Sequence, residues 1–167
     1  IGSASGLSSI ESNLKLWLDA KNTNGDGTNP ANDASVSEWK DLSGNNNHVS
    51  QSNGSRKPEY STSSGGSLDF NASGRGLVMG SSPDIIDDEL TIISVVNIDT
   101  FSGNSNVVAK SKNEAYRFRV ETNQNLWLLV NDTGSSHEVI QGNSLTATGN
   151  NIIGVTYQGG STKKIQF

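Results

Sequence analysis

Hydrophobic and polar residues alternate over short stretches along most of this chain. In residues 14–19, a leucine at every second position alternates with Lys15, Trp17 and Asp19. A period of two is the pattern of a β-strand with one buried face. The sequence therefore predicts a strand here whose leucines face the core and whose Trp17 lies on the opposite face.

Two later stretches carry the same kind of signal. Residues 116–120 (YRFRV) have apolar side chains at the first, third and fifth positions, and the apolar residues 126–130 follow after a polar turn. This spacing predicts an antiparallel hairpin. Residues 90–98 (LTIISVVNI) are apolar on both faces, which predicts a central strand covered on both sides.

About ten such stretches, with turn residues every ~8 to 12 positions, favour an antiparallel sandwich or barrel. Asn, Ser and Gly make up more than a third of the residues while aromatic residues are 6%, so we expect many turns and little helix. We expect residues 1–13, which are small and polar, to be an N-terminal arm or linker, and residues 14–167 to be one domain.

Charge and composition exclude several classes of function. The chain has 17 Asp and Glu against 12 Lys and Arg, a net charge of −5, and lacks a long basic run, so we expect no nucleic-acid partner. Its longest apolar runs are far shorter than the ~18 to 20 residues that cross a bilayer, so we expect no membrane insertion. Cysteine is absent, which excludes disulfides and thiolate chemistry. An Asn/Ser/Gly-rich acidic surface favours an extracellular, cell-surface or virion setting, with an ordinary cytosolic domain as the alternative.

A candidate calcium site lies in the loop after the first predicted strand. Asn22, Asn24 and Asp26 have the spacing of the opening of a calcium loop, Thr28 would give a backbone carbonyl at the seventh position, and Asp33 a carboxylate at the twelfth. Asn at the first position and Asp at the twelfth, where Asp and a bidentate Glu are usual, predict modest affinity. The alternative is a solvated loop closed by Asx turns with no ion.

The tryptophans are the candidate aromatic contacts. Trp17 is either a platform on which a sugar stacks or part of a second core layer, and its place within a strand favours the structural interpretation. Trp39 precedes a tight turn, where an indole most readily closes one end of a sandwich. Trp127 lies within an apolar strand and is predicted to be core. His48 and His137 have no partners at the spacing of a zinc site.

The segment WKDLSGN at residues 39–45 is the most specific motif in the chain. Taken with the segments that accompany it, it resembles the concanavalin A-like lectin/glucanase superfamily, and within it the bacterial laminin G-like domains. The accompanying segments are LWLDA (16–20), NGDGTNP (24–30), GSLDF (66–70), residues 90–98, and the late pair 153–159 and 164–167.

That resemblance implies an all-β, antiparallel jelly-roll β-sandwich. Members of the superfamily mostly bind glycans or proteins, often with calcium at the rim, and a minority hydrolyse polysaccharides with a Glu-x-Asp-x-x-Glu type of strand, which this chain lacks. We therefore expect a non-catalytic recognition module that binds glycan, with Ca²⁺ as a possible aid. The alternatives are a structural or decoration subunit that contacts proteins and, third, a β-glucanase-like hydrolase.

The resemblance also implies further strands after residues 163–167. We therefore expect an incomplete folding unit whose open edge is filled by later residues or by a strand from a neighbouring copy. The arm at residues 1–13 is the local candidate for such strand donation, although it is polar.

Overall fold

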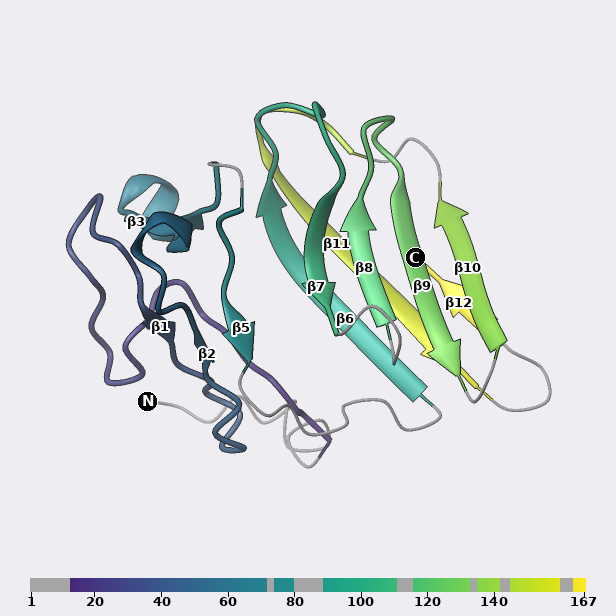
Figure 1. The fold of residues 1–167 in the computed structure, drawn as a ribbon, viewed down its shortest axis with the longest axis horizontal. Helices are drawn as coiled ribbons and strands as arrows, with labels where there is room; N and C mark the ends of the chain where they lie inside the picture. The colour runs from purple at the N-terminus through teal and green to yellow at the C-terminus, as the bar shows by residue number, and fades with distance from the viewer. Residues whose placement is uncertain are drawn as a thin grey trace. The chain divides into compact units, whose positions relative to one another are not determined.

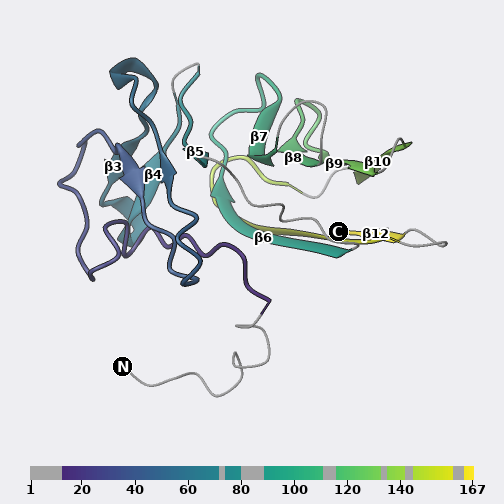
Figure 2. The same cartoon turned by 60° about the horizontal axis from the view of Figure 1, so that its bottom comes forward.

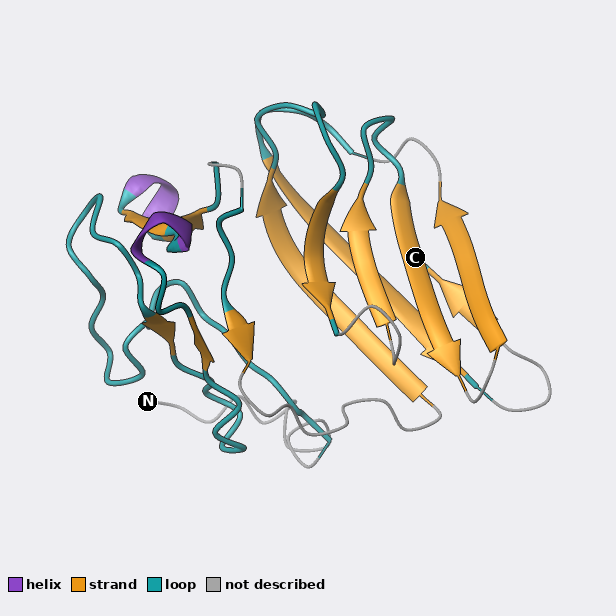
Figure 3. Ribbon diagram, viewed as in Figure 1, coloured by secondary structure: helices purple, strands orange, loops and turns teal. Residues whose placement is uncertain are grey.

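The computed structural model describes residues 13–71, 74–79, 89–110, 116–132, 135–141, 145–159 and 164–167. Over these ranges the chain forms short antiparallel strands with two single-turn 3₁₀ helices (Figure 3), so the predicted all-β, antiparallel class is confirmed. Contacts divide the chain into two compact units, Ile1–Pro83 and Asp84–Phe167. The division into an arm at residues 1–13 and one domain at residues 14–167 stays a prediction. Apart from Asn13, the predicted arm lies outside the described residues. No helix in the described ranges is long and apolar enough to cross a membrane.

The first unit is made of very short strands joined by long turns (Figure 1). One sheet has the order β1-β2-β5, and β3 and β4 form a separate hairpin. Its apolar core is small: among the described residues the buried apolar side chains are Val36, Val49, Pro58 and Tyr60. The elements are β1 (Glu38–Trp39), β2 (Val49–Ser50), η1 (Gly54–Arg56), β3 (Glu59–Ser61), η2 (Ser63–Gly65), β4 (Ser67–Asp69) and β5 (Val78–Met79).

Gly66, between η2 and β4, is a position where only glycine fits. Its φ is +110°, a conformation that side chains rarely adopt. A Cβ there would lie 2.6 Å from the hydroxyl of Tyr60 and 3.0 Å from the carbonyl oxygen of Ala20. The absence of a side chain therefore lets the β3–β4 hairpin pack closely against the segment that follows Trp17.

Residues 14–19 differ from their prediction. The alternation is confirmed, because Leu14, Leu16 and Leu18 are half-buried while Trp17 is exposed. The predicted strand is wrong, since the segment forms one isolated bridge, between Leu18 and Asp41. The reason is that side chains of a nearby turn, described below, take most of its backbone hydrogen bonds.

The second unit contains two antiparallel sheets with the orders β10-β9-β8-β7 and β12-β11-β6. The predicted hairpin is confirmed: β8 pairs with β9, from Tyr116 opposite Val130 to Val120 opposite Leu126. The strands are β6 (Glu89–Asn97), β7 (Ser105–Ala109), β8 (Tyr116–Val120), β9 (Leu126–Asp132), β10 (Ser135–Gln141), β11 (Asn150–Gln158) and β12 (Lys164–Gln166).

These two sheets lie as two layers in Figure 2, and a single core fills the space between them. Alternate residues of β8, β9 and β11 point into it, and Phe118, Leu128 and Val130 have no exposed surface. The period of two in the sequence therefore determines which face of each strand is buried. The connection order of a jelly roll is a finer statement that stays a prediction.

Strand β6 is apolar on both faces, as its sequence shows, but it is not the central strand that this pattern predicted. In the part of the chain that the structure describes it pairs with β11 alone. Leu90, Ile92 and Val96 pack against the core, whereas Ile93 and Val95 point outward and are exposed. The sequence pattern predicts apolar side chains on both faces of the strand, but it does not predict whether other residues of the protein cover both faces.

Candidate functional site

The carboxylate of Asp41 is the centre of the first unit's main turn. The residue is only 6% exposed. Its Oδ1 accepts hydrogen bonds from the backbone N–H groups of Trp17 and Ser43, both at 2.9 Å. Its Oδ2 accepts from the Ser43 hydroxyl at 2.8 Å and from the N–H of Asn47 at 2.9 Å. Each oxygen therefore has two donors, which satisfies a buried carboxylate.

These bonds set the protonation of Asp41. Burial raises the pKa of its carboxyl group, but the hydrogen bonds from Trp17, Ser43 and Asn47 together lower it more. The net result is a pKa below the ordinary value for aspartate, so the group stays ionised in the folded protein.

Further side chains of the same turn fix the segment that precedes Trp17. The amide nitrogen of Asn45 donates to the carbonyl of Leu14 at 2.7 Å, and that of Asn47 donates to the carbonyl of Lys15 at 2.8 Å. His48 Nδ1 accepts from the N–H of Asp41 at 3.0 Å. Side chains thus replace the neighbouring strand that residues 14–19 lack.

Trp17 is exposed although its backbone is held by hydrogen bonds on both sides. Its N–H is bound by Asp41, and its carbonyl accepts from the N–H of Leu42 at 2.8 Å. The residue is nevertheless 47% exposed, on the face that it shares with Lys15 and Asp19. An exposure of 47% does not fit the interpretation of Trp17 as part of a core layer, because no described residue covers most of its side chain.

The other two tryptophans are used structurally. Trp39 is half-buried, and its Nε1 donates to the carbonyl of Asp19 at 3.0 Å. Trp127 is buried, as predicted, with the guanidinium carbon of Arg119 3.8 Å from the ring centroid. Trp17 is therefore the tryptophan that remains accessible to a ligand.

The structure brings four of the five predicted calcium ligands into one loop. Asn22 Oδ1 accepts from the N–H of Gly27 at 2.7 Å, and Asp26 Oδ1 accepts from the N–H and hydroxyl of Thr28 at 2.9 and 2.6 Å. The amide nitrogen of Asn24 donates to the Thr28 hydroxyl at 2.9 Å. The bonds from the side chain and backbone of Thr28 lower the pKa of Asp26, so this exposed carboxyl group stays ionised and available to a cation.

Asp33, the fifth predicted ligand, belongs to a different turn. Its backbone N–H donates to the carbonyl of Tyr60 at 2.8 Å, and its φ is +62°. The carbonyl of Thr28 also accepts a bond within the loop, from the N–H of Asn24 at 3.3 Å. Within the described residues there is no group of three or more His, Cys, Asp or Glu side chains that could hold a metal ion. Calcium binding by Asn22, Asn24, Asp26 and Thr28 stays a prediction.

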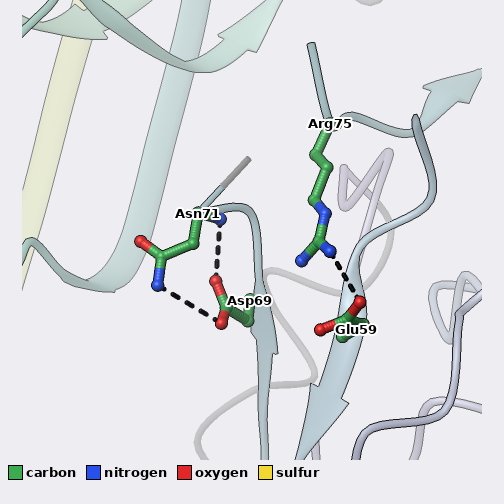
Figure 4. Close-up of polar contacts among 4 residues, drawn as sticks. All are labelled: Glu59, Asp69, Asn71 and Arg75. Atoms are coloured by element: carbon green, nitrogen blue, oxygen red, sulfur yellow. Dashed lines mark hydrogen bonds and ion pairs between the residues drawn. The ribbon is translucent and has the colours of Figure 1, made fainter. Parts of the chain in front are cut away.

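A pair of carboxylates that the sequence analysis missed lies on the β3–β4 hairpin. Glu59 and Asp69 are direct partners across the two strands. Figure 4 shows that each has its own donor: Arg75 Nη2 lies 2.6 Å from Glu59 Oε1, and the N–H of Asn71 donates to Asp69 Oδ1 at 2.7 Å. The two residues are ten positions apart on different strands, so only the register of the hairpin reveals them. The ion pair with Arg75 offsets the repulsion between them and makes Glu59 a hydrogen-bond acceptor held in place.

A shallow cavity of about 360 Å³ opens beside the candidate calcium loop. Its lining includes Asn24 and the ion pair between Lys40 and Glu38, whose charged atoms are 2.7 Å apart. The lining mixes amide, hydroxyl and paired charged groups, which suits the hydroxyl groups of a hydrated ligand.

Comparison of the chain with protein-family models, with curated proteins and with solved structures gives no match. The assignment of a function therefore rests on the geometry of the first unit.

Proposed function

We propose that this chain is a non-catalytic recognition module that binds glycan through Trp17, in an extracellular, cell-surface or virion setting. The observation that carries the proposal is the exposure of Trp17 on a segment whose backbone is held by the side chains of Asp41, Asn45 and Asn47. An indole offers a flat apolar surface with a polar edge, which suits the C–H face of a sugar ring. Because its backbone is already fixed, binding loses little conformational freedom.

The groups around Trp17 support the same ligand class. Lys15 and Asp19 share its face and provide a cation and a carboxylate for sugar hydroxyl groups. The resemblance to the laminin G-like domains implies a jelly-roll sandwich with calcium at the rim, and the loop of Asn22 and Asp26 would be that calcium site. Glu59 is held by its ion pair with Arg75, which favours a structural part for it in the β3–β4 hairpin.

The test is a glycan array probed with the whole chain, with Ca²⁺ and with EDTA. We expect binding that Trp17→Ala abolishes and Trp17→Phe weakens, because the ring supplies the contact area. Trp39→Phe is the matched control: it removes a different indole N–H, and we expect it to alter stability but not ligand preference. Absence of binding to every glycan at millimolar sugar would refute the proposal, and EDTA sensitivity would assign a part to calcium.

A second candidate function is a structural or decoration subunit that contacts proteins. Exposed apolar side chains on the second unit favour it. Electron microscopy of the native source separates the two functions, because a lattice or filament of this chain indicates assembly and isolated domains on a longer adhesin indicate binding.

A further inference from the structure

Three exposed apolar side chains lie together on the outer face of the β12-β11-β6 sheet. Ile93, Val95 and Ile152 are 74%, 64% and 80% exposed. The register places Ile152 directly opposite Val95, with Ile93 two residues away on the same face. The three therefore form one patch, and a contiguous apolar patch on a protein surface marks an interaction surface.

The charges around this patch indicate what covers it. Beside the three apolar residues the face carries Thr91 and Thr156, which are direct partners, so its middle is uncharged. Glu89 and Lys164, of opposite sign, lie at one end of the face on β6 and β12. The chain as a whole carries −5, so two copies repel one another over most of their surface. On this face two copies can approach without that repulsion.

The shape of the patch complements itself. Gly154 is the partner of Ile93 across the two strands and leaves a dent beside a projecting side chain. A Cβ at Gly154 would meet its nearest neighbours, Ile92 O and Ile93 Cγ1, at 3.4 and 3.7 Å, so the dent could hold a carbon atom in ordinary contact. A two-fold axis places the projection of one copy over the dent of the other, as an isologous interface requires.

We propose that two copies of this chain pack sheet on sheet through Ile93, Val95, Gly154 and Ile152. Packed sheets lie about 10 Å apart with interdigitated side chains, which buries residues that point straight out of a sheet. A stable interface buries roughly 800 Å² on each partner, and three apolar side chains supply only a small part of that area. The dimer is therefore weak and forms with rising concentration. A dimer also presents two copies of any ligand site, which raises the avidity for a repeating surface.

Sedimentation of the full chain from low micromolar to near-millimolar concentration tests this dimer. We expect a monomer–dimer equilibrium whose Kd rises roughly tenfold or more with Ile152→Lys, because the substitution buries an ammonium group in an apolar contact. The matched control is Val78→Lys, which makes the same change in charge at another exposed apolar position, 62% exposed on β5. We expect it to leave Kd unchanged.

Gly154→Ala is a second variant, which fills the dent while leaving the fold room for the methyl group. We expect it to raise the Kd of the dimer while leaving the melting temperature of the monomer nearly unchanged, because the added methyl group has room in the folded chain. A chain that stays monomeric at every concentration would overturn the proposal. So would a dimer that resists both Ile152→Lys and Gly154→Ala, since that outcome indicates association through another surface, such as the edge of β6.

Discussion

The two units are stabilised by different groups. The first unit is organised by one buried carboxylate, that of Asp41, which binds backbone groups far away in the sequence. The second unit is organised by alternating apolar side chains, with Phe118 and Leu128 fully buried between two sheets. Removal of the Asp41 carboxylate should therefore destabilise the first unit alone, and truncation of a buried apolar side chain should destabilise the second unit alone. The difference also indicates which unit suits function, because a rigid polar turn can expose an aromatic ring that a layered core would cover.

The largest expected effect is in the apolar unit. Phe118→Ala removes a fully buried ring and leaves a cavity, so we expect a loss of roughly 3 to 5 kcal/mol in the free energy of unfolding. Hydrogen exchange should localise the loss to amides of the second unit. Equal loss of protection around residues 14–17 and 43–47 would show that the units unfold as one and would contradict the comparison.

The next effect is in the polar unit. In Asp41→Asn an amide nitrogen would replace Oδ2 and face the N–H of Asn47, leaving two donors opposed. We expect a loss of about 3 kcal/mol, because bonds to a charged acceptor disappear and buried donors are left unpaired. Hydrogen exchange at Trp17, Ser43 and Asn47 reports it. Asp26→Asn is the control, since that carboxylate is exposed, and the prediction is wrong if both variants lose the same stability.

Calcium should act on the polar unit alone. If the loop binds Ca²⁺, a hundredfold excess over Kd should add about 2.7 kcal/mol by mass action. Asp26→Ala should abolish the rise in melting temperature, whereas Asp33→Asn should preserve it, because Asp33 lies in another turn and Asn tolerates its positive φ. A melting temperature that does not change between micromolar and millimolar Ca²⁺ would leave only the solvated loop.

The smallest effect is the pH dependence. Because the folded pKa of Asp41 lies below its unfolded value, its contribution is complete above about pH 4 and is lost as the pH falls through the folded pKa. We expect amides bound to Asp41 to lose protection in acid before amides of β8 and β9 do. In Asp41→Asn this difference should disappear, and an unchanged pH profile in that variant would refute the assignment.

The parts of the fold that were predictable are those set by local pattern. The alternation of YRFRV gave the buried face of β8, and a short polar turn placed β9 beside it. The same reasoning failed for residues 14–19 because it assigns a strand wherever residues alternate. A local pattern cannot show that Asp41, 24 residues from Trp17, accepts the backbone hydrogen bond that a partner strand would otherwise accept.

The candidate site was predictable only in part. The spacing of Asn22, Asn24 and Asp26 identified a real loop, since these side chains do meet there with Thr28. Asp33 was placed by counting along a template, and it lies in a separate turn, where its N–H donates to the carbonyl of Tyr60, so its part as a ligand stays a prediction. The exposure of Trp17 could have been inferred from its position opposite the leucines. Alternation predicts which side chains face away from the core, even where the segment does not pair as a strand.

The sequence separations around Asp41 also determine the order in which the turn can form during folding. Its bonds to Ser43 span two residues and form locally, whereas its bond to Trp17 closes a loop of 24 residues, at an entropic cost of about 3 kcal/mol. We therefore expect residues 41–48 to fold first and to capture residues 14–17 in a later, slower step. A shorter connection between Asp26 and Val36 should speed that capture, so the accessible indole of Trp17 would gain its fixed orientation earlier in refolding.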